Sequence, residues 1–282
     1  MILITGSKGQ LGHDLINELA KRGLSCRGVD IDEMDITAPE SVEKVFSEVQ
    51  PDAVIHCAAY TAVDAAEDNA AVCRNVNAYG TKNIAQACKK HGCKLLYLST
   101  DYVFDGTGIR PWEPDDEKCP LNVYGQTKYE GEQYIKELLT RYFIVRISWV
   151  FGKNGKNFVK TMLNLSKTRN ELSVVDDQLG SPTYTYDLAR LLTDMILTGK
   201  YGEYHATNEG ICSWYEFACA IFEEAGRDVK VHPISSAEFP SKAKRPKNSR
   251  MDKRKLTENG FVPLPPWRDA LKRYLKELSE EE

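Results

Sequence analysis

Short, β-branched apolar runs alternate with longer helical patterns along the first half of the chain, and this alternation restricts the possible folds strongly. The apolar runs predict strands over Ile2–Thr5, Ser25–Asp30, Ala53–Cys57, Lys94–Ser99 and Phe143–Ser148. The segments between them predict helices over Gln10–Arg22, Pro39–Val49, Ala70–His91 and Tyr124–Leu139. Strands that alternate with helices form βαβ units, whose right-handed crossovers place helices on both faces of a parallel sheet. We therefore predict an α/β fold with a doubly wound parallel sheet.

Three glycines follow the first predicted strand and open the first predicted helix. Gly6, Gly9 and Gly12 stand in the sequence GSKGQLG. A tight glycine turn at this place lets a pyrophosphate approach the helix N-terminus, where free N–H groups and the helix dipole favour anions. The turn therefore predicts a Rossmann-type dinucleotide site, and its GxxGxxG spacing is similar to that of short-chain dehydrogenases/reductases.

The end of the second predicted strand bears on the choice of cofactor. Asp30 is placed to accept hydrogen bonds from the adenosine ribose hydroxyls and to repel a 2′-phosphate, which favours NADH. Lys8 and Arg27 are two nearby cations that could instead hold that phosphate. The sequence thus predicts NADH or NADPH as the cofactor, with a preference for NADH.

The regular alternation loosens after Trp149. Helices are predicted near Asn157–Lys167, Tyr186–Thr198 and Ser213–Ala225, with Ser213 as the N-cap, and prolines mark the turns between them. We expect residues 1–149 to form the dinucleotide-binding Rossmann domain. Residues 150–282 are expected to form mainly a smaller, irregular substrate-binding lobe, with some segments that return to the sheet. The terminal ELSEEE is expected to be a solvated, frayed end.

Composition and charge exclude several classes of protein. No apolar run approaches the ~18 residues of a membrane span, and no secretory signal precedes the first strand. The eight cysteines form no CxxC pair, so we expect reduced thiols in a cytoplasmic protein. No HExxH motif or His/Cys cluster predicts a metal site. The net charge of −4 argues against nucleic acid as the main partner, although the basic run at 242–255 suits an anionic small molecule.

A tyrosine and a lysine one helical turn apart follow the fourth predicted strand. Tyr124 and Lys128, in YGQTK, lie on one face of the predicted helix. Chance yields about one such pair in a chain of this composition, so its position carries the argument. Thr100 ends the preceding strand, at the carboxyl edge where such sheets bind ligands. A tyrosine supported by an ammonium there can protonate a developing alkoxide, which predicts carbonyl reduction.

The wider motif set resembles one family. GSKGQLG, the DIT at 35–37, HCAAYTAVDAAE, STDYVFDG, YGQTKYEGE, RISWVFG, DQLGSPT and KRPKNSRMD occur in the order and spacing of the dTDP-4-dehydrorhamnose reductase family of extended short-chain reductases. The resemblance runs from Gly6 to about Leu256. It implies NAD(P)H-dependent reduction of the C4 ketone of dTDP-4-dehydro-L-rhamnose to dTDP-L-rhamnose, a precursor of surface polysaccharides.

The resemblance also implies residue roles. Tyr124 is the proton donor, Lys128 the cofactor-binding lysine and Thr100 the group that tunes the tyrosine. The expected cofactor-binding set is Gly6, Gly9, Gln10, Leu11, Gly12, Asp30, Asp35, Ile36, Ala58, Ala59, Tyr60, Leu98, Tyr124 and Lys128. The expected substrate-binding set is Thr100, Asp101 and Trp149 at the deoxysugar, with Gln178, Arg245 and Asn248 at the nucleotide diphosphate.

Alternatives stay open at this point. The nearest is another extended short-chain nucleotide-sugar epimerase or reductase. A 4,6-dehydratase is disfavoured, because Tyr102 follows Asp101 where those enzymes carry an acidic residue. A non-catalytic, NAD(P)-binding regulatory subunit is the alternative from another class. A homodimer is compatible with the resemblance, and some family members bind Mg²⁺ at a subunit contact, but no position in this chain identifies such a site.

Overall fold

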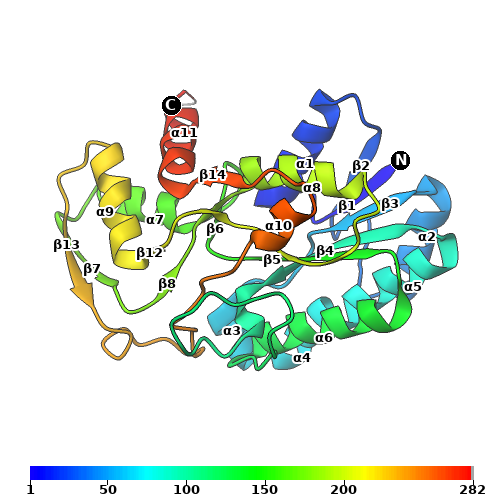
Figure 1. Cartoon of the computed structure of the whole chain (residues 1–282), viewed down its shortest axis with the longest axis horizontal. Helices are drawn as coiled ribbons and strands as arrows, with labels where there is room; N and C mark the ends of the chain where they lie inside the picture. Colours follow the sequence, from blue (N-terminus) through cyan, green and yellow to red (C-terminus); the bar gives the residue numbers. More distant parts are fainter. Residues whose placement is uncertain (281–282) are drawn as a thin grey trace.

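The computed structural model describes residues 1–280 and is built around a six-stranded parallel sheet. Its strand order is β10-β5-β4-β3-β1-β2 (Figure 1). The strands are β1 (Ile2–Thr5), β2 (Cys26–Val29), β3 (Ala53–His56), β4 (Lys94–Thr100), β5 (Tyr142–Ile147) and β10 (Gly202–His205). β1 pairs with both β2 and β3, so the chain winds outward in both directions from this point. The predicted doubly wound parallel sheet is confirmed.

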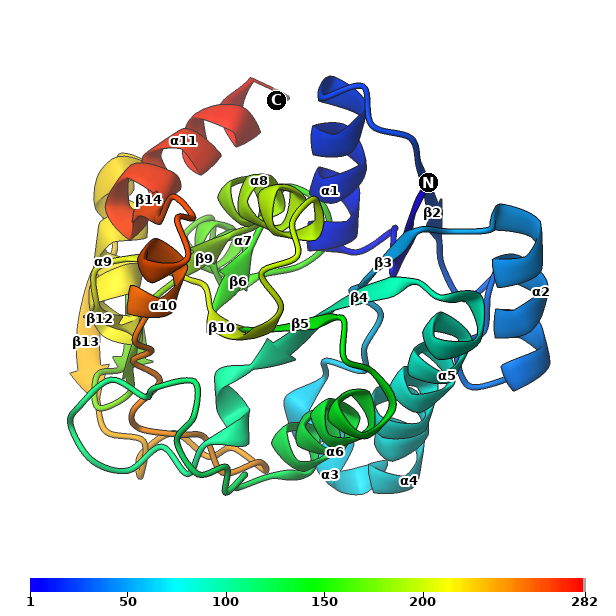
Figure 2. The same ribbon diagram turned by 45° about the vertical axis from the view of Figure 1, so that its right-hand side comes forward.

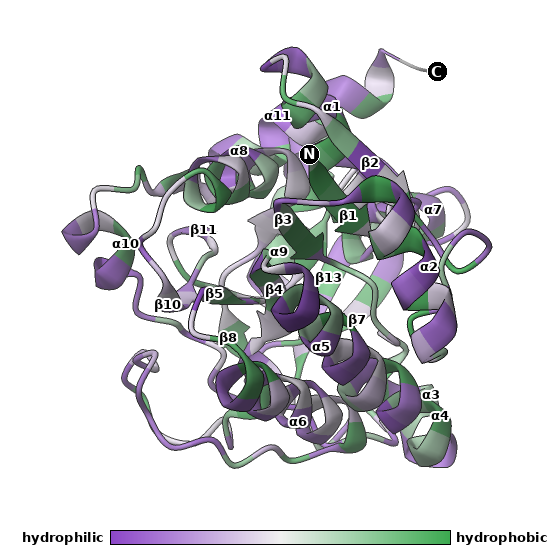
Figure 3. Cartoon of the chain, turned by 90° about the vertical axis from the view of Figure 1, so that its right-hand side faces the viewer, coloured by the Kyte–Doolittle hydropathy of each residue, from purple (hydrophilic) through white to green (hydrophobic). Residues whose placement is uncertain are grey.

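Helices cover both faces of the sheet (Figure 2). α1 (Gln10–Lys21) and α8 (Thr185–Ile196) pack on one face, in an apolar core that includes Leu15, Leu188 and Leu192. α2 (Pro39–Val49), α5 (Thr81–His91) and α6 (Val123–Leu138) pack on the other face, around Phe46 and Ile84. Figure 3 shows apolar strands in the centre and polar residues on the outward sides of α2 and α5. The two cores follow from strands that are apolar on both sides.

The segment predicted as one helix over 70–91 is divided in the structure. It contains α4 (Ala70–Arg74), the π-helical η1 (Asn75–Gly80) and α5, and α3 (Val63–Asp68) precedes it. Asn77 in η1 accepts a hydrogen bond from the Tyr60 N–H at 2.8 Å and donates to the Tyr60 carbonyl at 3.1 Å. A π-helical turn is a local widening that hydrophobic periodicity does not reveal. It ties the helix to the segment after β3.

The second half of the chain forms a lobe beside the sheet, seen on the left of Figure 1. Phe151, Phe217, Trp267 and Tyr274 lie in its apolar core. Its elements are β6 (Val150–Phe151), α7 (Phe158–Leu165), β7 (Glu171–Val175), β8 (Leu179–Gly180), β9 (Thr183–Tyr184), β11 (Asn208–Glu209), β12 (Cys212–Ser213), α9 (Trp214–Glu224), β13 (Lys230–Ile234), β14 (Leu264–Pro266) and α11 (Trp267–Ser279). β10, α8 and α10 (Arg254–Glu258) also come from this half of the sequence, but β10 joins the sheet and the two helices pack on it. The division at residue 149 stays a prediction.

The start of α9 confirms the predicted N-cap, and the end of α11 corrects the expectation of a frayed end. The Ser213 hydroxyl accepts from the Glu216 N–H at 3.0 Å and the Glu216 carboxylate from the Ser213 N–H at 2.7 Å, as the predicted N-cap requires. The expected frayed end is wrong for Glu277 to Ser279, which belong to α11. The Tyr184 hydroxyl donates to Glu277 at 2.5 Å and so anchors this last turn. Glu281 and Glu282 lie outside the described residues.

Two further expectations can be compared with the structure. The eight cysteines are all free thiols, and Cys119 is the exposed one among them. Within residues 1–280, no helix combines the length and the apolar character that a membrane crossing requires.

Candidate active site

A crevice of about 900 Å³ lies along the carboxyl edge of the sheet. It is lined by the ends of β1, β3 and β4, by the first turn of α1 and by Trp214 of the lobe. Every residue predicted to bind the cofactor lines this crevice, and so do Thr100, Asp101 and Trp149. The carboxyl ends of parallel strands meet at one edge, which explains why residues far apart in the sequence converge here.

The glycine turn lines the crevice at the N-terminus of α1. Gly6 has a φ of 67°, and a Cβ on it would lie 2.8 Å from the Ala58 nitrogen. A Cβ on Gly12 would lie 2.2 Å from the Gly6 carbonyl oxygen. Gly9 is the N-cap of α1 and offers no side-chain cap, so the first N–H groups of the helix are available to a ligand. The turn fits a pyrophosphate, because backbone donors and the helix dipole both attract anions.

The end of the crevice next to β2 is acidic. Both carboxylate oxygens of Asp30 accept backbone N–H groups, from Lys8 at 3.0 Å and from Ile31 at 2.9 Å. The Lys8 ammonium contacts Asp32 at 2.6 Å, and this carboxylate raises the pKa of the exposed lysine. Asp35 accepts from the Thr37 N–H at 2.9 Å. Asp30 is therefore occupied in holding the turn between β2 and the glycine loop.

Tyr124 is the second residue of α6 and faces the end of β4. Asn122 caps this helix by accepting the Gly125 N–H at 2.8 Å. The rings of Tyr124 and Tyr102 meet edge to face, with centroids 5.7 Å apart. Burial raises the pKa of Tyr124 above its ordinary value, and a side-chain hydrogen bond with Thr100 opposes that shift. The phenol is thus protonated at neutral pH and lies beside the hydroxyl of Thr100.

Lys128 lies one turn further along α6 and is buried. Burial lowers the pKa of its ammonium to about 7, and the carboxylate of Glu132 is the largest opposing influence. The Lys128 nitrogen lies 4.0 Å from the centroid of the Tyr97 ring, which offers a weak cation–π contact. This lysine therefore carries its charge only with help from neighbouring groups.

Thr100 ends β4 at the crevice, and Asp101 follows it directly. The Thr100 hydroxyl donates to Asp101 Oδ1 at 3.0 Å and accepts from the Tyr102 N–H at 3.2 Å. Burial raises the pKa of Asp101 to about 6. Ser249 lies near this carboxylate and opposes that shift, but Oδ2 makes no hydrogen bond of ordinary geometry with any of residues 1–280. Because an unpaired buried oxygen is costly, this atom is suited to a polar group of a ligand.

An aromatic wall closes the lobe side of the crevice. The ring of Trp149 stacks on Trp214, with centroids 3.8 Å apart and an angle of 15° between the planes. Trp149 has a φ of 50°, which is unusual for a bulky residue. Gly180 makes room for it, since a Cβ there would lie 2.9 Å from the indole ring. Sequence reasoning missed Trp214, because no spacing links residue 214 to residue 149.

Gln178, Arg245 and Asn248 do not line the crevice as described. Arg245 binds Asp64 at 2.7 Å, and its guanidinium also contacts Tyr102, which does line the crevice. Gln178 donates to Ser236 at 3.0 Å. Asn248 donates to the carbonyl groups of Arg110 and Thr107, at 2.8 and 3.2 Å, and so holds the segment after β4. The roles of these three residues at a nucleotide stay predictions.

No group of three or more His, Cys, Asp or Glu side chains suited to a metal ion occurs within the part of the chain that the structure describes.

Comparison with known proteins gives consistent matches over the whole chain. Residues 1–280 match the family model described as RmlD substrate binding domain. A dTDP-4-dehydrorhamnose reductase of Mycobacterium tuberculosis is 43% identical over 277 residues, covering 96% of this chain and 90% of the relative. The spore coat polysaccharide biosynthesis protein SpsK of Bacillus subtilis is 40% identical over 278 residues, covering 99% and 98%.

Two solved structures are also similar. A dTDP-4-dehydrorhamnose reductase of Clostridium acetobutylicum superposes with a TM-score of 0.96 at 45% identity and covers 99% of both chains. A dTDP-4-dehydrorhamnose reductase of Bacillus anthracis, solved in complex with NADP, superposes with a TM-score of 0.95 at 46% identity and covers 98% of both chains.

The Gly12→Ala variant tests the glycine turn. We expect it to lose dinucleotide binding by 10-fold or more and to be about 1–3 kcal/mol less stable, because its Cβ would overlap the Gly6 carbonyl. Fluorescence titration with NADPH and thermal denaturation measure the two effects. Gly199→Ala is the matched control, since the atom nearest to its Cβ is 4.0 Å away. Normal NADPH affinity in Gly12→Ala would contradict the assignment of the turn.

Proposed function

The chain belongs to the dTDP-4-dehydrorhamnose reductase family, and we propose that it reduces the C4 ketone of dTDP-4-dehydro-L-rhamnose to dTDP-L-rhamnose with a nicotinamide dinucleotide. The observation that carries this proposal is the convergence of Tyr124, Lys128 and Thr100 beside the glycine turn. Oxidation of NADPH by the wild-type protein in the presence of this sugar nucleotide is the direct test. Cofactor binding without oxidation would favour a regulatory subunit instead.

Tyr124, Lys128 and Thr100 have different roles in the proposed reaction. A nicotinamide dinucleotide held by the glycine turn and Lys128 would supply the hydride for C4 of the sugar. Tyr124 donates its phenolic proton to the ketone oxygen as negative charge develops there. Lys128, as an ammonium, stabilises the phenolate left behind and holds the nicotinamide ribose. The Thr100 hydroxyl keeps the phenol in place, and the crevice walls exclude water from the reacting atoms.

Substrate recognition uses the two sides of the crevice. Trp149, held by Trp214, offers a flat apolar surface to the deoxysugar, while the unpaired Oδ2 of Asp101 is available to a sugar hydroxyl. Arg245 is a guanidinium that can bind a diphosphate in bidentate fashion. Gln178 and Asn248 are proposed to support the nucleotide from the same side. Homodimer formation and a cytoplasmic location stay predictions.

NADPH is the proposed cofactor. The comparison with a relative solved with NADP does not support the preference for NADH that Asp30 suggested, and both oxygens of Asp30 already accept one backbone N–H each. The Bacillus anthracis relative was solved with NADP. Lys8, which is exposed and held by Asp32, can turn toward a 2′-phosphate. A dependence on Mg²⁺ is not supported by the residues described.

Lys8→Ala tests this choice of cofactor. Removal of the ammonium is expected to raise KM for NADPH several-fold while KM for NADH stays within a factor of two, because only NADPH carries the 2′-phosphate. Initial rates with each cofactor measure this. Lys21→Ala, at the far end of α1, is the control and is expected to change neither constant. Equal effects on both cofactors would place Lys8 away from the phosphate.

Tyr124→Phe tests the proton donor. We expect kcat to fall by about 100-fold or more, the usual contribution of general acid catalysis, while the affinity for NADPH is retained. Tyr129→Phe, five residues along the same helix, is the control and should keep the wild-type rate. Turnover close to wild type in Tyr124→Phe would remove the phenol from the mechanism.

Arg245→Ala tests the nucleotide end. Its KM for the sugar nucleotide is expected to rise by 10-fold or more with a smaller change in kcat, because the guanidinium binds ground state and transition state alike. Steady-state kinetics separate the two constants. A larger loss in kcat than in KM would instead place Arg245 at the reacting carbon.

A further inference from the structure

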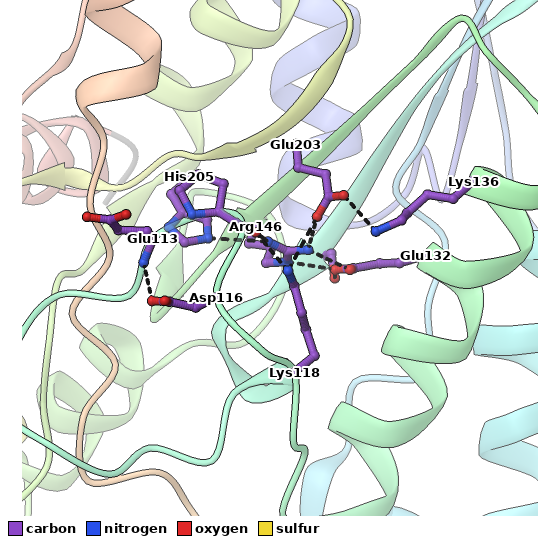
Figure 4. A network of polar contacts seen from close by, with 10 residues as sticks. Glu113, Asp116, Lys118, Glu132, Lys136, Arg146, Glu203 and His205 are labelled. Carbon is purple, nitrogen blue, oxygen red and sulfur yellow. Dashed lines mark hydrogen bonds and ion pairs between the residues drawn. The ribbon is translucent and has the colours of Figure 1, made fainter.

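A buried arginine lies directly behind the candidate active site. Arg146 on β5 is fully buried and pairs in register with Ser99 of β4, one residue before Thr100. Its guanidinium donates to Glu132 at 2.8 and 2.7 Å, to Glu203 at 2.5 Å and to the Pro114 carbonyl at 2.9 Å (Figure 4). A buried cation with this many partners is uncommon. One of these partners lies on the helix that carries Tyr124 and Lys128.

That partner is Glu132 on α6. It lies four residues after Lys128 and eight after Tyr124, so the three side chains share one face of the helix. Glu132 is fully buried, and its Oε1 also accepts the Ser99 hydroxyl at 2.6 Å. A single carboxylate therefore joins the end of β4, which carries Thr100, to the helix that carries Tyr124 and Lys128.

The two carboxylates that bind Arg146, those of Glu203 and Glu132, have different charged neighbours. Glu203 is neutralised from the outside by Lys136 at 2.7 Å and by Lys118 at 3.7 Å. Glu132 contacts Arg146 on one side and is the largest electrostatic influence on Lys128 on the other. Glu132 thus lies between two buried cations.

The other titratable groups that face Lys128 carry no charge at neutral pH. Burial lowers the pKa of His56 on β3 to about 3 and raises that of the neighbouring Cys57 to about 12. Burial also raises the pKa of Cys73 on α4, of Tyr97 on β4 and of Tyr124. The negative charge that Lys128 meets among the described residues therefore comes from Glu132.

We propose that Glu132 is a positioning residue for the reaction: anchored by Arg146, it holds Ser99, and through it Thr100, opposite Tyr124, and it keeps Lys128 protonated. Its part in catalysis depends on the proposed reductase function, whereas its effect on the protonation of Lys128 does not. The role differs from that of a purely structural ion pair, because it affects the ionisation of a residue in the crevice.

The pH profile of Glu132→Gln separates these roles. The glutamine keeps a hydrogen-bond acceptor for Ser99 but removes the charge beside Lys128. Because burial already lowers the pKa of Lys128 to about 7, loss of the carboxylate lowers it further, and the ammonium is lost at a lower pH. We expect the alkaline limb of kcat/KM to move down by about one pH unit, with kcat reduced about 10-fold and KM for the sugar nucleotide little changed.

Glu130→Gln is the matched control. Glu130 lies on the same helix and is also paired with an arginine, Arg74 at 2.9 Å, but near the surface. Its profile should follow that of the wild type. If the alkaline limb of kcat/KM in Glu132→Gln coincides with that of the wild type once both profiles are scaled to their maximum, the positioning role is rejected. Glu132 and Arg146 would then form a purely structural ion pair.

A titration that needs no turnover gives a second test. NMR of protein with ¹³Cε-labelled lysine, with Lys128→Met to assign the signal, follows the ionisation of Lys128 directly. The midpoint should be lower in Glu132→Gln than in the wild type and in Glu130→Gln, and equal midpoints would overturn the proposal. A wild-type protein that fails to oxidise NADPH would reject the proposed function but would leave this titration interpretable.

A double variant covers the case in which Glu132→Gln does not fold. Glu132→Leu with Arg146→Met replaces the buried pair by apolar groups of similar volume, an exchange that proteins often tolerate. Glu203 keeps its contacts with Lys136 and Lys118. We expect a folded protein that is still slow and still has the lowered alkaline limb. Wild-type rates and a wild-type profile in this variant would contradict the proposal.

Discussion

The parallel pairing of β3, β4 and β5 is the constraint on which the site depends. Because these strands run in one direction, their carboxyl ends meet at the same edge, and the segments that follow them all begin there. α6 returns to this edge with its N-terminus, so Tyr124 and Lys128 face the end of β4 across a short gap. If β4 ran in the opposite direction, Thr100 would lie at the far edge of the sheet, and no local change could restore the contact.

The same packing of helices on both faces of the sheet also buries charged side chains beside the site. Helices on both faces exclude water from the centre of the sheet, so Lys128, Glu132 and Arg146 are charged groups in an apolar environment. A buried charge is stable only when it is paired and hydrogen-bonded. The ion pairs alternate in sign from Glu132 through Arg146 and Glu203 to the more exposed Lys136, and Lys128 lies one helical turn before Glu132. The ionisation of these buried groups and the stability of the fold are therefore coupled through one row of side chains.

The lobe contributes shape rather than charge to the crevice. Trp149 lies at a left-handed backbone position, which costs about 1–3 kcal/mol unless the surroundings compensate. The stacking with Trp214 and the space left by Gly180 provide that compensation. A rigid aromatic wall built from three distant segments suits a ligand that presents a flat apolar face. The strained residue lies where the lobe begins, directly after β5.

The sequence by itself determined the doubly wound sheet, the glycine turn and the pairing of Tyr124 with Lys128, because strand and helix periodicities and a one-turn spacing are local properties of the chain. The residues predicted to bind the cofactor lie mostly at or just after the ends of predicted strands, and the structure brings them to one crevice, while their role at a cofactor stays a prediction. Only the tertiary structure decided that the helix over 70–91 has a π-helical turn, that Trp214 stacks on Trp149, and that Arg146 and Glu132 meet behind Ser99. These features depend on contacts between residues 14 to 65 positions apart or on the widening of one helical turn, and neither leaves a period in the sequence. The hydrogen bonds of Asn248 with Thr107 and Arg110, and of Asp30 with Lys8, illustrate the same limit, because each joins segments that are far apart in the sequence.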